Sequence, residues 1–270
     1  MKKILNLLIL LVFIPSFSFA CSLTLTDKIN GGQCVDMGNY QMYVRIFGKA
    51  KPVVVFDSGS GDDSTVWDMV IPQVSQFSRV VIYDRAGLGK SDARPGNSPI
   101  SSQDSVNALK LLLIKENIKP PYILVGHSRG GLNMQLFAEK YPKEIAGVVL
   151  IDSVSRNQNF HDPAPPADSK YYREAITFDE SRAQVKNAES FPSVPLIVLT
   201  ATNHHESEQR EEIWRKWQGE IAQLSPKSMQ MFAWGSGHYI QKEQPELVVD
   251  AIYTLIKLNN LATKDTPRNH

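Results

Sequence analysis

The chain has 270 residues and carries 29 Lys and Arg against 28 Asp and Glu, so its formal net charge at pH 7 is +1. No block of like charge stands out as a nucleic-acid or membrane-surface patch, and we expect neither partner. The length is sufficient for one α/β domain with a sizeable core.

The N-terminus, residues 1–20, has the layout of a secretory signal peptide. Two lysines are followed by an apolar run over Ile4–Ile14, and the small residue Ala20 precedes Cys21. The run is short for a membrane span. We therefore expect an exported protein, periplasmic or secreted, in which residues 21–270 form one domain without a stable membrane span. An uncleaved anchor, or a lipid on Cys21, is the alternative.

The two cysteines of the chain, Cys21 and Cys34, both remain after such a cleavage. An even pair in an exported protein is typical of a disulfide, which would tie down the N-terminal arm. The alternative is two free thiols, because neither cysteine has further ligand residues at metal-binding spacing.

Short apolar runs predict the strands. Cys34–Met37 and Gln41–Phe47 are separated by Gly38-Asn39, a pair that tolerates the positive φ of a turn, and this predicts a hairpin. Further runs have the pattern of strands covered on both faces: Val53–Phe56, Val80–Tyr83, Ile123–Val125, Val148–Ile151 and Leu196–Leu199.

Helical patterns alternate with these strands. The clearest cover Gln103–Ile114, the segment after Gly130, and about Pro245–Leu258. The sequence therefore predicts the α/β class, with a mostly parallel central sheet flanked by helices and an antiparallel start.

One segment, at about residues 153–192, interrupts this alternation. It is rich in Pro, Asp, Ser and charged residues and lies between two predicted strands. Long insertions at the carboxyl ends of strands usually cover or shape a site, so we expect a small lid. A flexible solvated loop is the alternative.

The best candidate nucleophile is Ser128, at the centre of Gly126-His127-Ser128-Arg129-Gly130. This segment matches the G-x-S-x-G nucleophile elbow and lies between a predicted strand and a predicted helix, as that motif requires. The flanking residues must be small because the turn is tight and the serine adopts a strained conformation.

A serine needs a base, and His238 is the best placed. It lies in the Gly-rich stretch GSGHYI, after an apolar run and before the last helix. His127 lies inside the elbow, where we expect it to pack or hydrogen bond beside the nucleophile.

The base needs a carboxylate, and two strand ends offer one. Asp152 directly follows Val148–Ile151, where rigid backbone can aim its side chain. Glu206 or Glu208, in the loop after Leu196–Leu199, is the alternative. We favour Asp152 over Glu206.

Two backbone N–H groups are expected to form an oxyanion hole. One belongs to Arg129, the residue after the serine, and the other to Ser60 in the loop after Val53–Phe56, where neighbouring glycines allow close approach. The Arg129 side chain either attracts an anionic substrate group or pairs with a carboxylate of the protein itself.

We expect neither a metal nor a cofactor. His204, His205 and Glu206 could ligate an ion, but adjacent residues in a polar loop rarely converge on one ion. Gly89 and the two residues after it resemble the end of a phosphate-binding loop, but Asp84 stands where that motif requires glycine.

Five segments together resemble the α/β-hydrolase superfamily, specifically its bacterial single-domain hydrolases. They read STVWDMV, VVIYDRAGLGKSD, YILVGHSRGG, GVVLIDS and GSGHYIQKEQPELVVDAI. The resemblance runs from about Val35 to Leu258. It implies an eight-stranded core with a lid after the sixth strand, Ser128 as nucleophile, His238 as base, and no cofactor.

The chain departs from that superfamily at two places. Ser58-Gly59 stands where His-Gly commonly begins the oxyanion loop. The loop after the seventh strand lacks the usual aspartate near the strand tip, and the resemblance then favours an acid after the sixth strand, which is Asp152.

These observations predict a serine hydrolase that cleaves a carboxylic ester, or a related acyl bond, of a small molecule through an acyl-enzyme. An aminopeptidase-type amide hydrolase that uses the same triad is one alternative. The other is a binding protein that keeps the fold and has lost catalysis.

Overall fold

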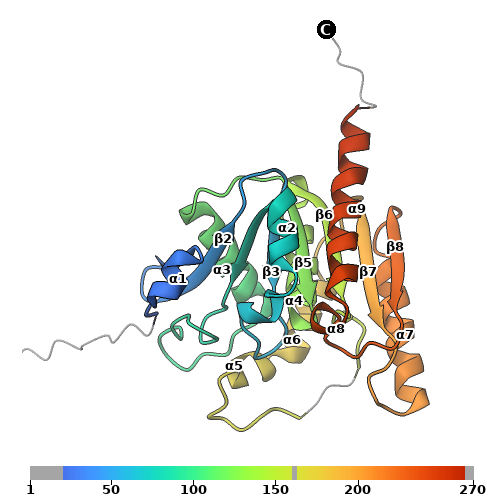
Figure 1. Cartoon of the computed structure of the whole chain (residues 1–270). Coiled ribbons are helices and arrows are strands. Elements are labelled where there is room, and N and C mark those ends of the chain that lie inside the picture. Colours follow the sequence, from blue (N-terminus) through green and yellow to red (C-terminus); the bar gives the residue numbers. More distant parts are fainter. Residues whose placement is uncertain (1–20, 160–162, 265–270) are drawn as a thin grey trace, which may run out of the picture.

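The computed structural model describes residues 21–159 and 163–264 (Figure 1), so the predicted signal peptide lies outside the described residues. Eight strands form one sheet in the order β1-β2-β4-β3-β5-β6-β7-β8. The strands are β1 Gly32–Asp36, β2 Gln41–Phe47, β3 Val53–Asp57, β4 Arg79–Tyr83, β5 Tyr122–His127, β6 Ile145–Ile151, β7 Leu196–Ala201 and β8 Ser228–Ala233.

The sheet begins antiparallel and continues parallel. β2 pairs antiparallel with both β1 and β4, and the remaining neighbours pair in parallel. Parallel strands end at one edge of the sheet, so the residues that follow β3, β5, β6, β7 and β8 gather there. The predicted fold class is confirmed, and so is the hairpin, in which Met37 N–H donates to Tyr40 C=O at 2.9 Å.

Helices cover both faces of the sheet (Figure 1). They are α1 Leu25–Ile29, α2 Ile71–Phe77, α3 Ser102–Lys115, α4 Arg129–Lys140, α5 Tyr172–Ala175, α6 Phe178–Lys186, α7 Glu208–Ala222, α8 Ile240–Glu243 and α9 Pro245–Lys264, with short 3-10 turns at Ser64–Trp67 and Pro142–Glu144. Of the predicted helices, the last one runs beyond the expected end at Leu258.

Strand residues divide the core into two layers. Val53 and Val55 of β3 pack with the apolar residues of α3 and α4, whereas Val54 and Phe56 pack with those of α2 and α9. Successive side chains of a strand point to opposite faces, so a continuous apolar run is required when helices cover both.

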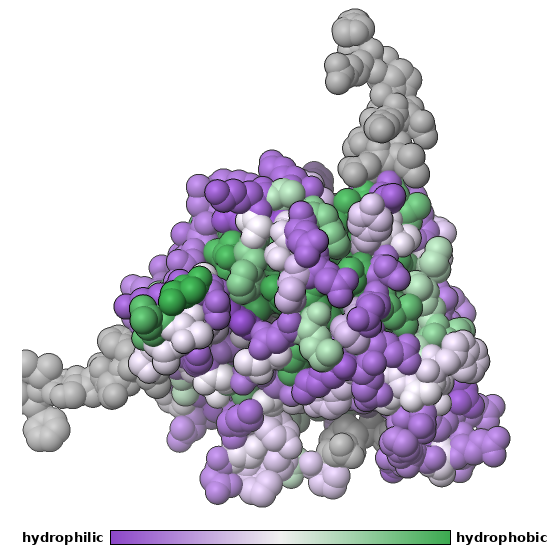
Figure 2. All heavy atoms as spheres, in the orientation of Figure 1, coloured by the Kyte–Doolittle hydropathy of each residue, from purple (hydrophilic) through white to green (hydrophobic). Residues whose placement is uncertain are grey.

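The N-terminal arm is fixed to the sheet. A disulfide joins Cys21 to Cys34 of β1 with the Cα atoms 6.1 Å apart, as predicted. Asp27 of α1 accepts a hydrogen bond from the Tyr43 hydroxyl at 3.0 Å. Figure 2 shows apolar spheres over α1, where Leu25 and Ile29 are each 75% exposed.

The insertion between β6 and β7 contains α5 and α6 and is anchored to the body of the domain. Ser181 of α6 accepts from Ser102 N–H of α3 at 3.0 Å, and Val185 is fully buried against the core. Within the described ranges, no helix is long and apolar enough to cross a membrane.

We predict that reducing the Cys21–Cys34 disulfide destabilises the protein. The bond closes a loop with a sequence separation of 13, and the lost restraint on the unfolded chain corresponds to about 3 kcal/mol of unfolding free energy. Urea unfolding with and without dithiothreitol measures this. The double variant Cys21→Ser/Cys34→Ser is the control, and equal stability of the parent in both conditions would contradict the prediction.

Candidate active site

Ser128 lies on a tight corner between β5 and α4. Its backbone has φ 52° and ψ −120°, a conformation that L-residues rarely adopt outside strained sites. A Cβ on Gly126 would lie 2.6 Å from Gly130 O, and one on Gly130 would lie 2.2 Å from Asp57 O. Side chains cannot fit at these two positions, and this explains why the motif has glycine on both sides of the serine, as inferred from the sequence.

A cavity of about 570 Å³ opens beside this serine. Its lining includes Ser128, Ser60, His127, His204 and His238. The insertion and α7 also contribute to its wall, so the segment predicted as a lid does line the cavity. The volume is within the range of small-molecule sites.

The structure brings Asp152, and not Glu206, to His238. Asp152 follows β6, is fully buried, and its Oδ2 accepts a hydrogen bond from His238 Nδ1 at 2.6 Å. Glu206 pairs instead with Arg210 at 3.5 Å and is half-exposed. Ser128 lines the same cavity as His238, although no hydrogen bond joins their side chains in the described part of the chain.

His204 also belongs to this site, although the sequence patterns do not predict it there. Its Nε2 donates to Asp152 Oδ2 at 2.7 Å, and its Nδ1 donates to Glu211 Oε2 at 2.8 Å. Glu211 also accepts from the backbone N–H of His204 at 2.6 Å. His204 is therefore held between two carboxylates.

The Asp152 carboxylate has four donors in all. Besides the two imidazoles on Oδ2, its Oδ1 accepts from Trp214 Nε1 at 2.8 Å and from Ala201 N–H at 3.1 Å. Burial alone raises the pKa of Asp152, but the hydrogen bonds from His204 and His238 outweigh it and hold the pKa well below the usual range. Asp152 is thus an anion with a fixed orientation.

His204 carries a positive charge at neutral pH. Burial by itself lowers its pKa, but the hydrogen bonds and charges of Asp152 and Glu211 outweigh burial and raise the pKa to about 9. Both ring nitrogens then carry protons, as donation to two carboxylates requires.

Asp152, His204 and His238 present ligand atoms within 4.8 Å of one another, a spacing compatible with a metal ion. However, His204 Nε2 and His238 Nδ1 each donate a proton to Asp152 Oδ2. A metal ion binds an imidazole nitrogen through a lone pair, which a protonated nitrogen does not have. The trio fits a hydrogen-bonded ionic network better than a ligand set. The combination of His204, His205 and Glu206 considered from the sequence is not brought together, since His205 is exposed and Glu206 faces Arg210.

The Arg129 side chain is fully buried and is not part of the cavity lining. Its guanidinium donates to Ile100 O, Thr177 Oγ1 and Ser181 Oγ, each at 3.1 Å. Its Nε lies 3.9 Å from Glu174 Oε2. Of the two roles that the sequence allows for this side chain, the contacts agree with the intramolecular one.

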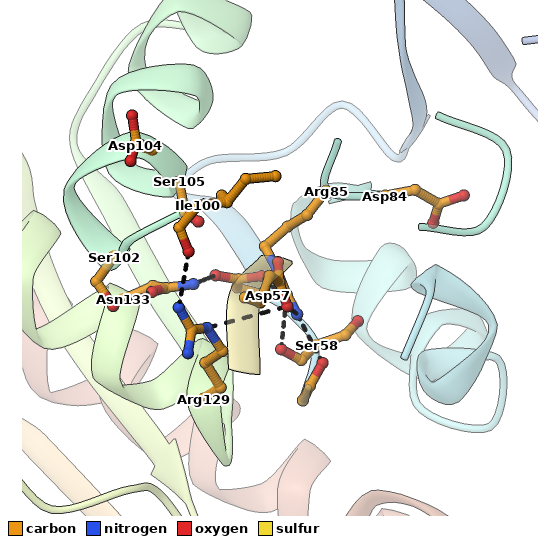
Figure 3. A network of polar contacts seen from close by, with 12 residues as sticks. Asp57, Ser58, Asp84, Arg85, Ile100, Ser102, Asp104, Ser105, Arg129 and Asn133 are labelled. Carbon is orange, nitrogen blue, oxygen red and sulfur yellow. Dashed lines mark hydrogen bonds and ion pairs between the residues drawn. The ribbon is translucent and has the colours of Figure 1, made fainter. Parts of the chain in front are cut away.

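A second buried network holds the loop that carries Ser60. Figure 3 shows Arg85 directed at this loop, where it donates to Asp57 Oδ1 at 2.7 Å and to Ser58 O at 2.6 Å. It also donates to Gly59 O at 2.7 Å and to both oxygens of Glu174, on α5 of the insertion. A single guanidinium therefore couples the insertion to the loop beside the nucleophile.

Comparisons with known proteins agree with this fold. Residues 52–251 match the family described as alpha/beta hydrolase fold, and the chain belongs to that family. The uncharacterized protein YqjL of Bacillus subtilis (strain 168) is 28% identical over 214 residues, which cover 76% of this chain and 84% of that protein.

Solved structures of differing chemistry share the fold. An esterase from Thermogutta terrifontis superposes with a TM-score of 0.63 at 20% identity, covering 84% of this chain and 99% of that one. The enol-lactonase from Burkholderia xenovorans LB400 gives 0.61 at 16%, covering 83% and 100%. An ancestral haloalkane dehalogenase gives 0.68 at 15%, covering 85% and 99%. One fold supports several reactions, so the reaction must be argued from the site.

A usable signal for the missed residues was present in the sequence. From the sequence, Glu206 and Glu208 are expected in a loop, and no helix is predicted for the segment that forms α7. Trp214, Trp217 and Ile221 nevertheless recur at helical spacing on one side of α7. This pattern predicts an amphipathic helix, and in the structure that helix brings Glu211 and Trp214 to the site.

We predict that His204 stabilises the fold most strongly at low pH. Its pKa is raised from 6.5 to about 9 on folding, so its contribution is complete below about pH 6.5 and is lost as pH rises through about 9. The variant His204→Gln should unfold with about 1–3 kcal/mol less free energy than the parent at about pH 6, and with a smaller deficit at about pH 10.

Urea unfolding of both proteins at each pH measures this deficit. His205→Asn, a change at the exposed neighbouring histidine, is the matched control. A deficit for His204→Gln that stays constant or grows with pH would contradict the assignment of a charged His204.

Proposed function

We propose that this protein is a serine hydrolase that cleaves a carboxylic ester of a small molecule through an acyl-enzyme. The observation that carries the proposal is the 2.6 Å hydrogen bond from His238 Nδ1 to the buried Asp152, in a cavity that Ser128 also lines from a nucleophile elbow. Family membership supports hydrolysis in general, and the site supports the serine route.

In this mechanism Ser128 Oγ attacks the ester carbonyl while His238 Nε2 takes the serine proton. The C–O bond to the alcohol then breaks, and the alcohol leaves with the proton from His238. Water attacks the acyl-serine, giving its proton to His238, and the bond to Ser128 Oγ breaks with return of that proton. The products are the carboxylic acid and the alcohol, and the enzyme is regenerated.

Asp152 and His204 act through His238. Asp152 holds Nδ1 protonated, so that Nε2 carries the lone pair that a base needs. His204 and Glu211 hold Asp152 from the other side. We regard His204 as a positioning residue, since its two nitrogens are both engaged away from the serine.

Stabilisation of the negatively charged oxygen of the tetrahedral intermediate is assigned to the backbone N–H groups of Arg129 and Ser60. Arg129 is the first residue of α4, where N–H groups lack intrahelical acceptors and the helix dipole favours an anion. Ser60 lies in the loop that Arg85 holds through the carbonyls of Ser58 and Gly59. This rigid support suits a preorganised oxyanion hole.

We also propose that the protein acts outside the cytoplasm. The Cys21–Cys34 disulfide supports this, because structural disulfides persist in oxidising compartments. It agrees with the export that the first twenty residues predict. The substrate is then a small acyl compound met in the periplasm or the medium.

We predict that Ser128→Ala and Asp152→Asn each lower kcat/KM for p-nitrophenyl acetate and butyrate by about a thousandfold or more, because triad members act as a unit. Glu206→Gln, which tests the alternative acid, should lower it by less than about tenfold. Release of p-nitrophenol by the purified protein measures these rates.

Retained activity in Ser128→Ala would overturn the serine mechanism. A greater loss in Glu206→Gln than in Asp152→Asn would transfer the role of the acid to Glu206. A folded parent that hydrolyses no ester, and that no serine-directed fluorophosphonate labels, would favour the binding-protein alternative.

A further inference from the structure

His127, the residue before the nucleophile, has an acceptor atom that no group of the described chain satisfies. Its Nε2 lies 2.9 Å from His238 O, and because a carbonyl only accepts, Nε2 carries the proton. Burial and the neighbouring His238 lower the pKa of His127 well below its ordinary value, so the ring is neutral. Nδ1 is then a lone-pair acceptor, and it is buried without a partner among the described residues.

Asp62 presents a second such acceptor. Its Oδ2 is buried, has no hydrogen-bond partner in the described chain, and lies 4.0 Å from His127 Nδ1. The other oxygen, Oδ1, is 3.5 Å from the Tyr239 hydroxyl. Since His127 is neutral, the two atoms do not form an ion pair. Two acceptors face each other, and neither has a donor.

Buried acceptors of this kind call for a donor from outside the chain. Leaving a buried polar group without a hydrogen-bond partner is unfavourable, and more so for a charged group. A water molecule, or a nitrogen with two or more hydrogens, can donate to both atoms at once, which a hydroxyl with one hydrogen cannot do. A positive charge on that nitrogen complements Asp62.

The pair lies in the wall of the cavity that contains the nucleophile. Asp62 and His127 both line the cavity that contains Ser128. In the chain, His127 directly precedes the nucleophile and Asp62 follows Ser60 by two residues. A group bound by the pair would therefore be close to the carbonyl under attack.

We propose that Asp62 and His127 form a subsite for a protonated amine carried by the acyl group near its carbonyl. The inference rests on the proposed function and narrows it to amino-acyl substrates. It adds a specificity-determining role for two residues that take no part in the acyl transfer described above.

The test compares three methyl esters that share a three-carbon acyl chain: those of alanine, lactate and propionate. They carry an amine, a hydroxyl and neither group. Hydrolysis is followed in a pH-stat, with the parent, Asp62→Asn and Asp63→Asn. Asp63 is the matched control, because it is the next residue, does not line the cavity, and caps a 3-10 turn that Asn can also cap.

The parent should prefer the alanine ester to the propionate ester by about tenfold or more in kcat/KM, as expected for a charge-assisted hydrogen bond. Asp62→Asn should reduce this ratio by about tenfold, and Asp63→Asn should leave the ratio unchanged. Equal rates for all three esters, or a preference for lactate that matches that for alanine, would overturn the amine subsite while leaving the proposed function in place.

Binding without turnover separates the two proposals. In Ser128→Ala, calorimetry should show tighter binding of the alanine ester than of the propionate ester, and Ser128→Ala/Asp62→Asn should lose the difference. If the parent hydrolyses no ester but this difference is found, the subsite stands and the proposed hydrolysis fails. If neither discrimination nor hydrolysis is found, both are overturned.

Discussion

The arrangement of the site depends on one buried carboxylate. Asp152 is fully inaccessible to solvent, and an isolated charge in such a place would cost many kcal/mol. It is tolerated because four donors reach it, from the end of β7, the loop that follows, α7 and the loop after β8. The requirement to satisfy this anion brings the ends of three neighbouring strands to one point, and the imidazole of His238 is fixed there as a consequence.

The loop on the other side of the nucleophile depends on a buried cation. Arg85 is fixed by hydrogen bonds to Asp57 and Glu174, and its guanidinium also donates to the carbonyls of Ser58 and Gly59 (Figure 3). Because Glu174 belongs to the insertion, Arg85 links the wall of the cavity to the loop with Ser60. Loss of one partner from a buried ion pair strongly destabilises the folded protein, because it leaves an uncompensated buried charge. This requirement favours a single arrangement of the loop.

Sequence patterns predicted those features of the fold and the site that are encoded by residues close together in the chain. The elbow at Ser128 is encoded by adjacent glycines, and Asp152 stands at a strand tip, so short segments were enough to nominate both as candidates and to predict the α/β class. His204 was missed because its meaning lies in a partner 52 positions away, and a histidine in a polar stretch gives no sign of a buried acid. The unsatisfied acceptors of His127 and Asp62 depend on packing between elements, which no periodicity records.

Three imidazoles near the serine show how environment separates residues of one type. The ring centroids of His127 and His204 lie 4.6 Å and 6.1 Å from that of His238. Burial beside His238 lowers the pKa of His127 and keeps its ring neutral, whereas Asp152 and Glu211 raise the pKa of His204 and keep its ring charged. A cation so close to Asp152 would weaken the support that Asp152 gives to a protonated His238. Glu211 offsets that cation from the far side, so the base retains a net anionic partner while the carboxylate is held in place by hydrogen bonds from both sides.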